Sequence, residues 1–378
     1  MRRCLVCPVD GRVLALDVRT WRCPCGSPLD LSPAARRAPD PPGAAWRWAG
    51  AVDLVGRGSW STLTLGEGGT PLVTPDPATP ELHAKLEHLM PTGSFKDRGA
   101  VVLVGLARAL GARRVVADSS GNAGVAIAAY ASRAGLPAEV FVPGSVSAAK
   151  LAQLRAHGAA VSVVDGDRES VADAAVHAVA SDAEAFYASH AWHPAFLEGT
   201  KTMALELWEQ LGRRPPDEVV LPVGNGTLLL GAARGFAELA AAGLIDRPPR
   251  LIAVQAAACA PLAEAWREGL DRPAPVPTSP TLAEGIAIAS PPRGSQILAA
   301  VAATGGRVLA VDEDEIATAH RRLARLGLAV EPTSAATYAG ALRQLAEEPG
   351  AATVVLALCG AGWKSPPPEG SPVPRKVR

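Results

Sequence analysis

The stretch KLEHLMPTGSFKDRGA (residues 85–100) is the most informative segment of this 378-residue chain. It begins like a strand, passes through Pro91 and Gly93, and continues as a helix with Lys96 near its start. A lysine amine held on a rigid element can condense with an aldehyde cofactor, and it can also act as a general base. A solvated lysine on a helix is the commoner role for such a residue. The segments around it must therefore decide between the two.

Outward from this stretch, short apolar runs alternate with longer runs rich in Ala and Leu. RVVADSS (114–120) precedes NAGVAIAAYASRAG (122–135), and the pairing recurs until ATVVLALCG (352–360). The strand-like runs are continuously apolar, as expected for strands that are covered by helices on both faces. The sequence therefore predicts an α/β fold with parallel-rich twisted sheets flanked by helices.

Two loops between predicted strands and helices carry candidate anion sites. In SSGNAG (119–124), backbone N–H groups and two hydroxyls can bind a carboxylate, although simple N-capping is an alternative. LPVGNGTLLLGAARG (221–235) combines a strand, a glycine-rich loop and a helix, which suits a phosphate, although a GNG string is often only a tight turn. The second loop has neither the GxGxxG spacing of dinucleotide sites nor the GK[ST] of a P-loop.

Taken in order, these strings resemble the motifs of pyridoxal-phosphate (PLP) enzymes of fold type II, the tryptophan synthase β-like family, in its threonine synthase-like branch. LGEGGTPL (65–72), FLEGTKT (196–202), TLAEGIAI (281–288) and EPTSAATYAG (331–340) extend the resemblance over residues 60 to 365 or so. The resemblance implies a two-domain enzyme in which Lys96 carries PLP and Asn122 bonds to its 3′-oxygen. It also implies two loops, one for the substrate carboxylate (Ser119, Ser120, Gly121, Asn122, Ala123) and one for the cofactor phosphate (Gly224, Asn225, Gly226, Thr227, Leu228).

Cys359 stands in LCGAGWK (358–364), where the family has a Ser or Thr beside the pyridine nitrogen of the cofactor. A thiol is a much weaker hydrogen-bond donor than a hydroxyl. The resemblance therefore implies an unprotonated pyridine nitrogen and a moderated electron sink, which suits loss of a β- or γ-leaving group. Cys359 can equally be a small buried hydrophobe, and both roles can hold together.

Four of the six cysteines lie in the first 25 residues: Cys4, Cys7, Cys23 and Cys25. This clustering favours a metal site over a disulfide scaffold. The segment resembles the zinc ribbon at the front of many threonine synthase-like proteins, which implies a closed, structural Cys4 site. A metal-free remnant is the alternative, since the second pair is CxC and Pro8 follows Cys7.

Composition and spacing set the remaining expectations. We expect a ribbon-like module (1–31), a linker (32–60), a catalytic region (61–365) with a smaller subdomain inserted at about 100–185, and a disordered Pro-rich tail (366–378). Lys plus Arg and Asp plus Glu both number 37, so no basic excess indicates a nucleic-acid partner. Neither a signal peptide nor a membrane span is visible, so a cytoplasmic location is the default. The family is usually homodimeric.

The resemblance implies a small amino-acid substrate, α-proton abstraction, and elimination or replacement at the β or γ carbon. In the threonine synthase reaction, O-phosphohomoserine is converted to threonine. The chain departs from the threonine synthase pattern at three places: Phe196 stands where an arginine is usual, Ala123 stands where a threonine is common, and GNGT lacks a second asparagine. These changes remove hydrogen-bond donors for a substrate phosphate. Arg98, His190 or His193 would have to supply donors in their place. A serine/threonine ammonia-lyase or a cysteine synthase-like β-replacement enzyme is therefore the alternative, and an inactive cofactor-binding or interaction protein is a third.

Overall fold

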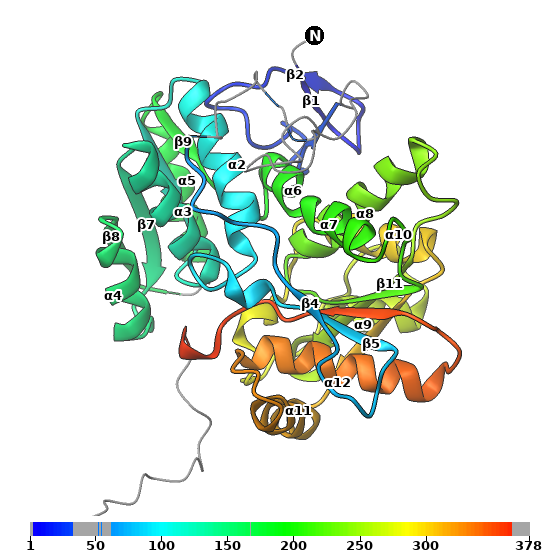
Figure 1. Ribbon diagram of the computed structural model, residues 1–378. Helices are drawn as coiled ribbons and strands as arrows, with labels where there is room; N and C mark the ends of the chain where they lie inside the picture. Colours follow the sequence, from blue (N-terminus) through cyan, green and yellow to red (C-terminus); the bar gives the residue numbers. More distant parts are fainter. Residues whose placement is uncertain (1–2, 33–51, 53, 55–61, 167, 365–378) are drawn as a thin grey trace, which may run out of the picture.

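Two parallel-rich sheets form the framework of the computed structural model, which describes residues 3–32, 52, 54, 62–166 and 168–364 (Figure 1). The larger sheet has the strand order β12-β11-β10-β13-β5-β4, and only β4 runs antiparallel to its neighbour. Its strands are β4 (Leu72–Val73), β5 (Leu82–Lys85), β10 (Glu218–Pro222), β11 (Arg250–Ala256), β12 (Arg307–Val311) and β13 (Val354–Ala357). The smaller sheet has the order β8-β7-β6-β9 and is parallel throughout. It consists of β6 (Arg114–Ala117), β7 (Ala138–Pro143), β8 (Ala160–Val164) and β9 (Ala185–Tyr187).

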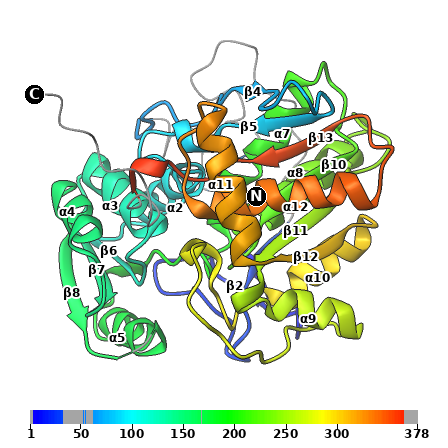
Figure 2. The ribbon, with the colours of Figure 1, turned by 90° about the horizontal axis from the view of Figure 1, so that it is seen from below.

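Both faces of the larger sheet are buried, which explains why its strands read as unbroken apolar runs. Along β10, Val219 and Leu221 enter one core while Val220 enters the other. The first core is filled by α7 (Thr202–Gln210), α8 (Thr227–Ala241), α9 (Pro261–Glu268) and α10 (Gly294–Ala303). The opposite face is covered by α11 (Glu313–Arg325) and α12 (Pro332–Glu347), which lie together in Figure 2.

The smaller sheet is also covered on both faces. Val115 and Val140 face a core that they share with α2 (Lys96–Ala109) and α3 (Asn122–Ala134), while Val116 and Phe141 face α5 (Arg168–Ala180). Helices α4 (Ala148–Ala156) and α6 (Ala195–Thr200) complete the layers. Short 3₁₀ turns occur at Glu87–Leu89, Ala257–Cys259, Glu284–Ile286 and Gly362–Lys364.

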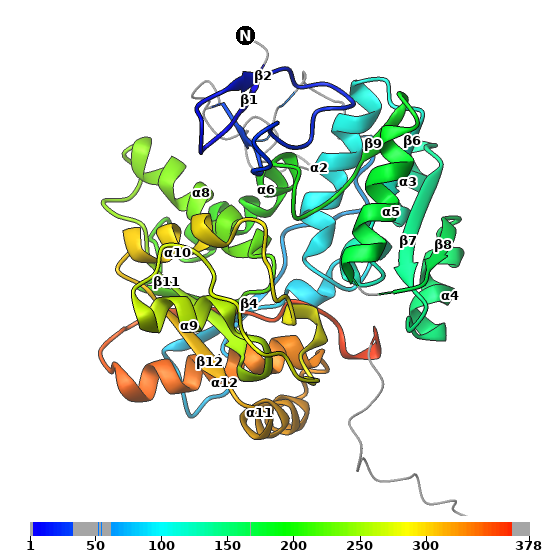
Figure 3. The same ribbon diagram turned by 180° about the vertical axis from the view of Figure 1, so that it is seen from behind.

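The N-terminal module is a three-stranded antiparallel sheet that lies against α6 (Figure 3). Its strands are β1 (Leu5–Val6), β2 (Val13–Leu14) and β3 (Asp30–Leu31). Arg293 is fully buried beneath it and donates to the carbonyls of Leu29, Ala191 and Trp192. Because Arg293 also pairs with Asp30 at 3.2 Å, one guanidinium ties the module to the segment that enters α6.

The predicted α/β class is confirmed, and β6 and β13 form within the runs 114–120 and 352–360. The strand-like start predicted for the 85–100 stretch is wrong, because β5 ends at Lys85 and Glu87–Leu89 form a 3₁₀ turn. Strands β4 and β12 were not predicted from the sequence. The two residues of β4 are too few to form a recognisable pattern, and the RVLAV of β12 is followed directly by a charged helix start. The predicted linker and tail lie largely or wholly outside the described residues, and the domain boundaries stay predictions. None of the described helices is long and apolar enough to cross a membrane.

Candidate active site

Lys96 is the first residue of α2, as the sequence predicts. The preceding loop is fixed from two sides: Thr92 donates to the Asp97 carboxylate through its backbone N–H (2.7 Å) and its hydroxyl (2.5 Å), and the N–H of Phe95 donates to the carbonyl of Cys359. Desolvation by burial lowers the pKa of the Lys96 amine to about 8. About a tenth of this amine is therefore unprotonated at pH 7, whereas an ordinary lysine is almost entirely protonated there, and the unprotonated form is the one that acts as a nucleophile or general base.

Cys359 follows β13 and is 1% exposed. Burial, reinforced by the nearby carboxylates of Glu331 and Glu87, raises the pKa of its thiol well above the ordinary value. The thiol donates only a long contact of 3.7 Å to the carbonyl of Ala357. Cys359 is thus a neutral, weakly bonded group close to Lys96, in keeping with both roles considered from the sequence.

The loop 119–123 lies between β6 and α3, where the sequence places it. The N-cap residue of α3 is Gly121, and no side chain caps the helix, so the simple capping role is not found for Ser119, Ser120 or Asn122. A Cβ on Gly124 would lie 1.7 Å from the Ser119 carbonyl oxygen, so only glycine permits this tight turn. The first N–H groups of α3 are left available to an anion, as predicted for a substrate carboxylate.

The loop 224–228 leads from β10 into α8. Gly226 has a left-handed φ of 68°, and a Cβ there would lie 2.3 Å from the Ile297 side chain, so glycine is required on both grounds. Thr227 and Leu228 are buried in the first turn of α8. The Asn225 amide lies 3.3 Å from the ring of His190, the contact that joins this loop to the segment before α6.

Asn122 donates through its amide to the carboxylate of Glu331 at 2.9 Å, which links the start of α3 to the start of α12. Glu331 opens the string EPTSAATYAG, but no role for this residue is predicted from the sequence. A glutamate directly before a proline at a predicted helix start was the available signal, because such a residue lies at the loop–helix junction where ligands bind in α/β sheets.

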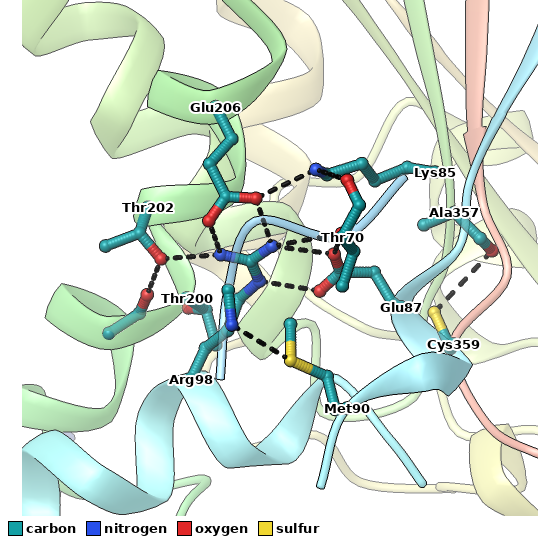
Figure 4. Close-up of polar contacts among 12 residues, drawn as sticks. Thr70, Lys85, Glu87, Met90, Arg98, Thr200, Thr202, Glu206, Ala357 and Cys359 are labelled. Carbon is teal, nitrogen blue, oxygen red and sulfur yellow. Dashed lines mark hydrogen bonds and ion pairs between the residues drawn. The ribbon is translucent and has the colours of Figure 1, made fainter. Parts of the chain in front are cut away.

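Arg98 does not face a substrate, contrary to the suggestion that it replaces a lost phosphate donor. It is 1% exposed and pairs with Glu87 at 2.6 Å and with Glu206 at 2.7 Å (Figure 4). Thr202 accepts a further bond from the guanidinium at 2.9 Å, and Thr70 contacts it at 3.4 Å. Its donors are therefore committed within the protein.

Lys85 completes this cluster, hereafter the Arg98 network: Arg98, Lys85, Glu87 and Glu206. Lys85 is fully buried and pairs with Glu206 at 2.8 Å. Burial alone would raise the pKa of Glu206, but Arg98 and Lys85 outweigh it and hold the pKa at about 2. Two buried cations thus face two buried carboxylates, and the network is balanced.

Histidines 190 and 193 do not supply a cation either. Burial lowers the pKa of His190 well below its ordinary value, and the charge of Lys96 adds to the effect. Burial lowers the pKa of His193 to about 3. Phe196 is fully buried, lies 5.8 Å from the His190 ring, and packs so closely on α2 that a Cβ on Gly99 would lie 2.5 Å from it. This side of the site is neutral and partly aromatic.

The N-terminal cysteines form a cluster that differs from the predicted one. The ligand atoms of Cys7, Asp10, Cys23 and Cys25 lie within 4.8 Å of one another, and no other candidate metal group occurs among the described residues. Cys4 is not part of it, because β1 separates Cys4 from Cys7, and positions three apart on an extended chain point to opposite faces. The turn after Cys7 instead places Asp10 close to Cys7, Cys23 and Cys25. Asp10 is followed by Gly11 in the same way as Cys25 is followed by Gly26.

Known proteins resemble the chain along most of its length. The family model for pyridoxal-phosphate dependent enzymes matches residues 63–360. The chain belongs to this family. It is 38% identical to threonine synthase of Mycobacterium tuberculosis over 329 residues, which cover 83% of this chain and 89% of the relative. It is 34% identical to threonine synthase of Methanocaldococcus jannaschii over 364 residues, which cover 92% of this chain and 88% of the relative. Among solved structures, the threonine deaminase of T.th. is similar with a TM-score of 0.64 and 30% identity, covering 77% of this chain and 89% of that one.

The residues present fit PLP. A desolvated, partly deprotonated lysine, an uncapped helix start and a glycine loop whose Cβ positions are filled by neighbours occur in the segments that follow β5, β6 and β10. These are the groups needed for an aldehyde, a carboxylate and a phosphate respectively. The family's cofactor is thus matched by this chain's own chemistry.

Proposed function

We propose that this PLP-dependent lyase acts on a small amino acid in the manner of threonine synthase, converting O-phosphohomoserine to threonine. The observation that carries the proposal is the lowered pKa of the Lys96 amine, about 8. With this pKa the amine can act both as a nucleophile and as a general base. The threonine synthases at 34–38% identity support the reaction type.

Bound PLP supplies an aldehyde to hold the amino acid and a conjugated ring to spread the charge left by a departing α-proton. Lys96 would hold the cofactor, and its free amine would accept the proton from the α carbon of the substrate. The N–H groups at the start of α3 hold the substrate carboxylate beside the loop Ser119–Ala123. The loop Gly224–Leu228 holds the cofactor phosphate, and Asn122 bonds to the 3′-oxygen. Cys359 keeps a neutral, weak donor near the ring.

A second candidate is a serine/threonine ammonia-lyase or a β-replacement enzyme. The specific observation in its favour is the neutral side of the site, where Phe196, His190 and His193 offer no cation and Arg98 is committed to its network. A phosphate ester is bound best by positive donors.

A substrate panel distinguishes the candidates. We expect the purified chain, loaded with PLP, to release phosphate from O-phosphohomoserine and to form threonine. Ketoacid from serine or threonine, with no phosphate released, favours the ammonia-lyase. Release of acetate from O-acetylserine with formation of cysteine from added sulfide, or of a thioether from an added thiol, favours β-replacement. Turnover of none of these, with the cofactor bound, favours the inactive binding protein.

We also propose that Cys7, Asp10, Cys23 and Cys25 hold a structural zinc ion. The thiols of Cys7 and Cys25 lie 3.6 Å apart, a separation that tetrahedral Zn–S bonds of about 2.3 Å require. The N–H groups of Val9 and Asp10 point at Cys7 Sγ at 3.4 Å, as in a metal-binding turn. We expect Cys23→Ser to lose zinc, measured by metal analysis, while Cys4→Ser keeps it; loss of zinc in both variants would restore the four-cysteine set. The homodimer and the cytoplasmic location stay predictions.

A further inference from the structure

Glu331 is held at a fixed place between the two sheets. Its backbone N–H donates to the carbonyl of Gly360 at 2.9 Å, just past the end of β13. The hydroxyl of Ser334, in the first turn of α12, accepts from the N–H of Cys359 at 2.8 Å and from that of Gly360 at 3.3 Å. The start of α12 is therefore bonded to the strand end that carries Cys359, and Glu331 moves with it.

The Glu331 carboxylate lies directly against the backbone of Gly360. A Cβ at position 360 would lie 2.1 Å from the carboxylate carbon and 2.3 Å from both oxygens. Any side chain at position 360 would therefore displace the Glu331 carboxylate from this place. Glu331 is 9% exposed, so the carboxylate is packed into the site and directed away from solvent.

The carboxylate accepts one N–H of the Asn122 amide at 2.9 Å, across 209 positions of sequence. This bond connects the helix that follows β6 of the smaller sheet with the helix that packs on the larger one. A carboxamide has two N–H donors and one carbonyl. With one N–H directed at Glu331, the nitrogen end of the amide is fixed and the second N–H is free to bond elsewhere.

No described residue forms an ion pair with Glu331, in contrast to the carboxylates of the Arg98 network. The charged groups that act on it are Lys96 from α2, Lys364 from the chain segment after β13, and Lys150 from α4. Burial raises the pKa of Glu331 in spite of these three cations and of the Asn122 bond. A buried carboxylate without an ion pair is costly, and one aimed at a predicted cofactor residue needs a functional reason.

We propose that Glu331 is a positioning residue of the active site, which orients the Asn122 amide so that its second N–H faces the 3′-oxygen of the cofactor. The inference rests on the proposed function, because it takes the PLP-binding role of Asn122 from it. Glu331 then contributes to cofactor affinity only through Asn122.

A double-mutant cycle on cofactor affinity tests this. PLP is titrated into the apoproteins of wild type, Asn122→Ala, Glu331→Ala and the double variant, and the dissociation constant is measured by equilibrium dialysis. We expect each single change to weaken binding about tenfold, the value of one hydrogen bond, and the double change to weaken it no further than about tenfold. Glu331→Gln, whose amide oxygen can still accept, is expected within about threefold of wild type, as is the control Glu284→Gln at an exposed position of the neighbouring motif.

A hundredfold loss in the double variant would show independent contributions and overturn the proposal, as would unchanged affinity in Glu331→Ala. Thermal unfolding of each apoprotein checks folding; if Glu331→Ala does not fold, Glu331→Met replaces it in the cycle. Failure of the wild type itself to bind PLP would instead contradict the proposed function.

Discussion

Lys96 and Arg98 lie two residues apart at the start of α2, yet their surroundings differ in kind. Arg98 faces two carboxylates and shares them with Lys85, so its charge is matched within the protein. Lys96 forms no ion pair among the described residues, and burial lowers its pKa to about 8. The carboxylate that acts on its pKa, that of Glu331, also forms no ion pair among the described residues.

The difference shows how one fold can use buried charge in two ways. A matched network holds its groups in one protonation state and fastens secondary structure: here β5, α2 and α7 and the loop at Thr70. Burial without an ion pair lowers the pKa of an amine and raises the pKa of a carboxyl group. Both pKa values shift toward neutral pH, where such groups can exchange protons. The Arg98 network therefore stabilises the fold, whereas the surroundings of Lys96 adjust the reactivity of its amine.

The largest contrast is expected from Lys96→Met. Removing the amine should lower turnover on the active substrate by on the order of 10³-fold or more, since nucleophile and proton acceptor are lost together. The free energy of unfolding of the apoprotein should stay within about 1 kcal/mol of wild type or rise, because a partly charged, desolvated amine is replaced by an apolar chain. Steady-state kinetics and urea unfolding measure the two effects; a strongly destabilised variant would place Lys96 in a structural role.

Arg98→Met should instead reduce the stability of the protein strongly. It leaves Glu87 and Glu206 with only Lys85 to neutralise them, which costs about 3–5 kcal/mol of stability in comparable buried pairs. Arg108→Met, on an exposed position of the same helix, is the matched control and should change stability by about 0.5 kcal/mol or less. Urea unfolding of the apoproteins decides the matter, and a stable Arg98→Met protein would refute the structural assignment.

Removing one charge of each sign should destabilise the protein less than the two separate losses add up to. Lys85→Met leaves a surplus carboxylate and Glu206→Gln a surplus cation, whereas the double variant leaves Arg98 paired with Glu87. We expect the double variant to be more stable than the sum of the single changes predicts, by about 1–3 kcal/mol. Additive losses would mean that the four groups do not act as one balanced set.

How much of this could be predicted differed between the two regions. Lys96, the loop at Asn122 and the loop at Gly226 were predicted because each is a short string at a strand–helix junction. The Arg98 network was not, since Lys85, Arg98 and Glu206 are 121 positions apart at the extremes, and no local pattern records which buried side chains meet. For this reason Arg98 was wrongly considered as a phosphate donor.

The same limit applies to Cys4 and to Glu331. Four cysteines suggested four ligands, whereas the structure brings Asp10, and not Cys4, close to Cys7, Cys23 and Cys25; which of these residues bind a metal stays a prediction. Glu331 stood inside a quoted motif, yet its contact with Asn122 exists only because two sheets meet. Strand periodicity is visible in a sequence, whereas contacts between sheets require the fold.

The smallest expected effect concerns pH. Below pH 8 the unprotonated fraction of Lys96 rises about tenfold per pH unit, and above it the fraction levels off. The rate of covalent PLP loading should therefore rise to about pH 8 and then flatten, whereas an ordinary lysine would keep rising to about 10.4. Glu206, whose pKa is lowered to about 2, contributes stability that is present above its ordinary pKa and lost as pH falls toward 2. Rate measurements and acid unfolding thus report the two regions separately.

The central claim is that Lys96, and not another lysine of the site, carries the cofactor. Apoprotein is incubated with PLP, reduced with borohydride to fix the cofactor, digested, and analysed by peptide mass spectrometry. We expect the added mass on the peptide that contains Lys96, and a visible absorbance band before reduction that is absent in Lys96→Met. A label on Lys364 or Lys85 at the expense of Lys96, or no label at all, would contradict it.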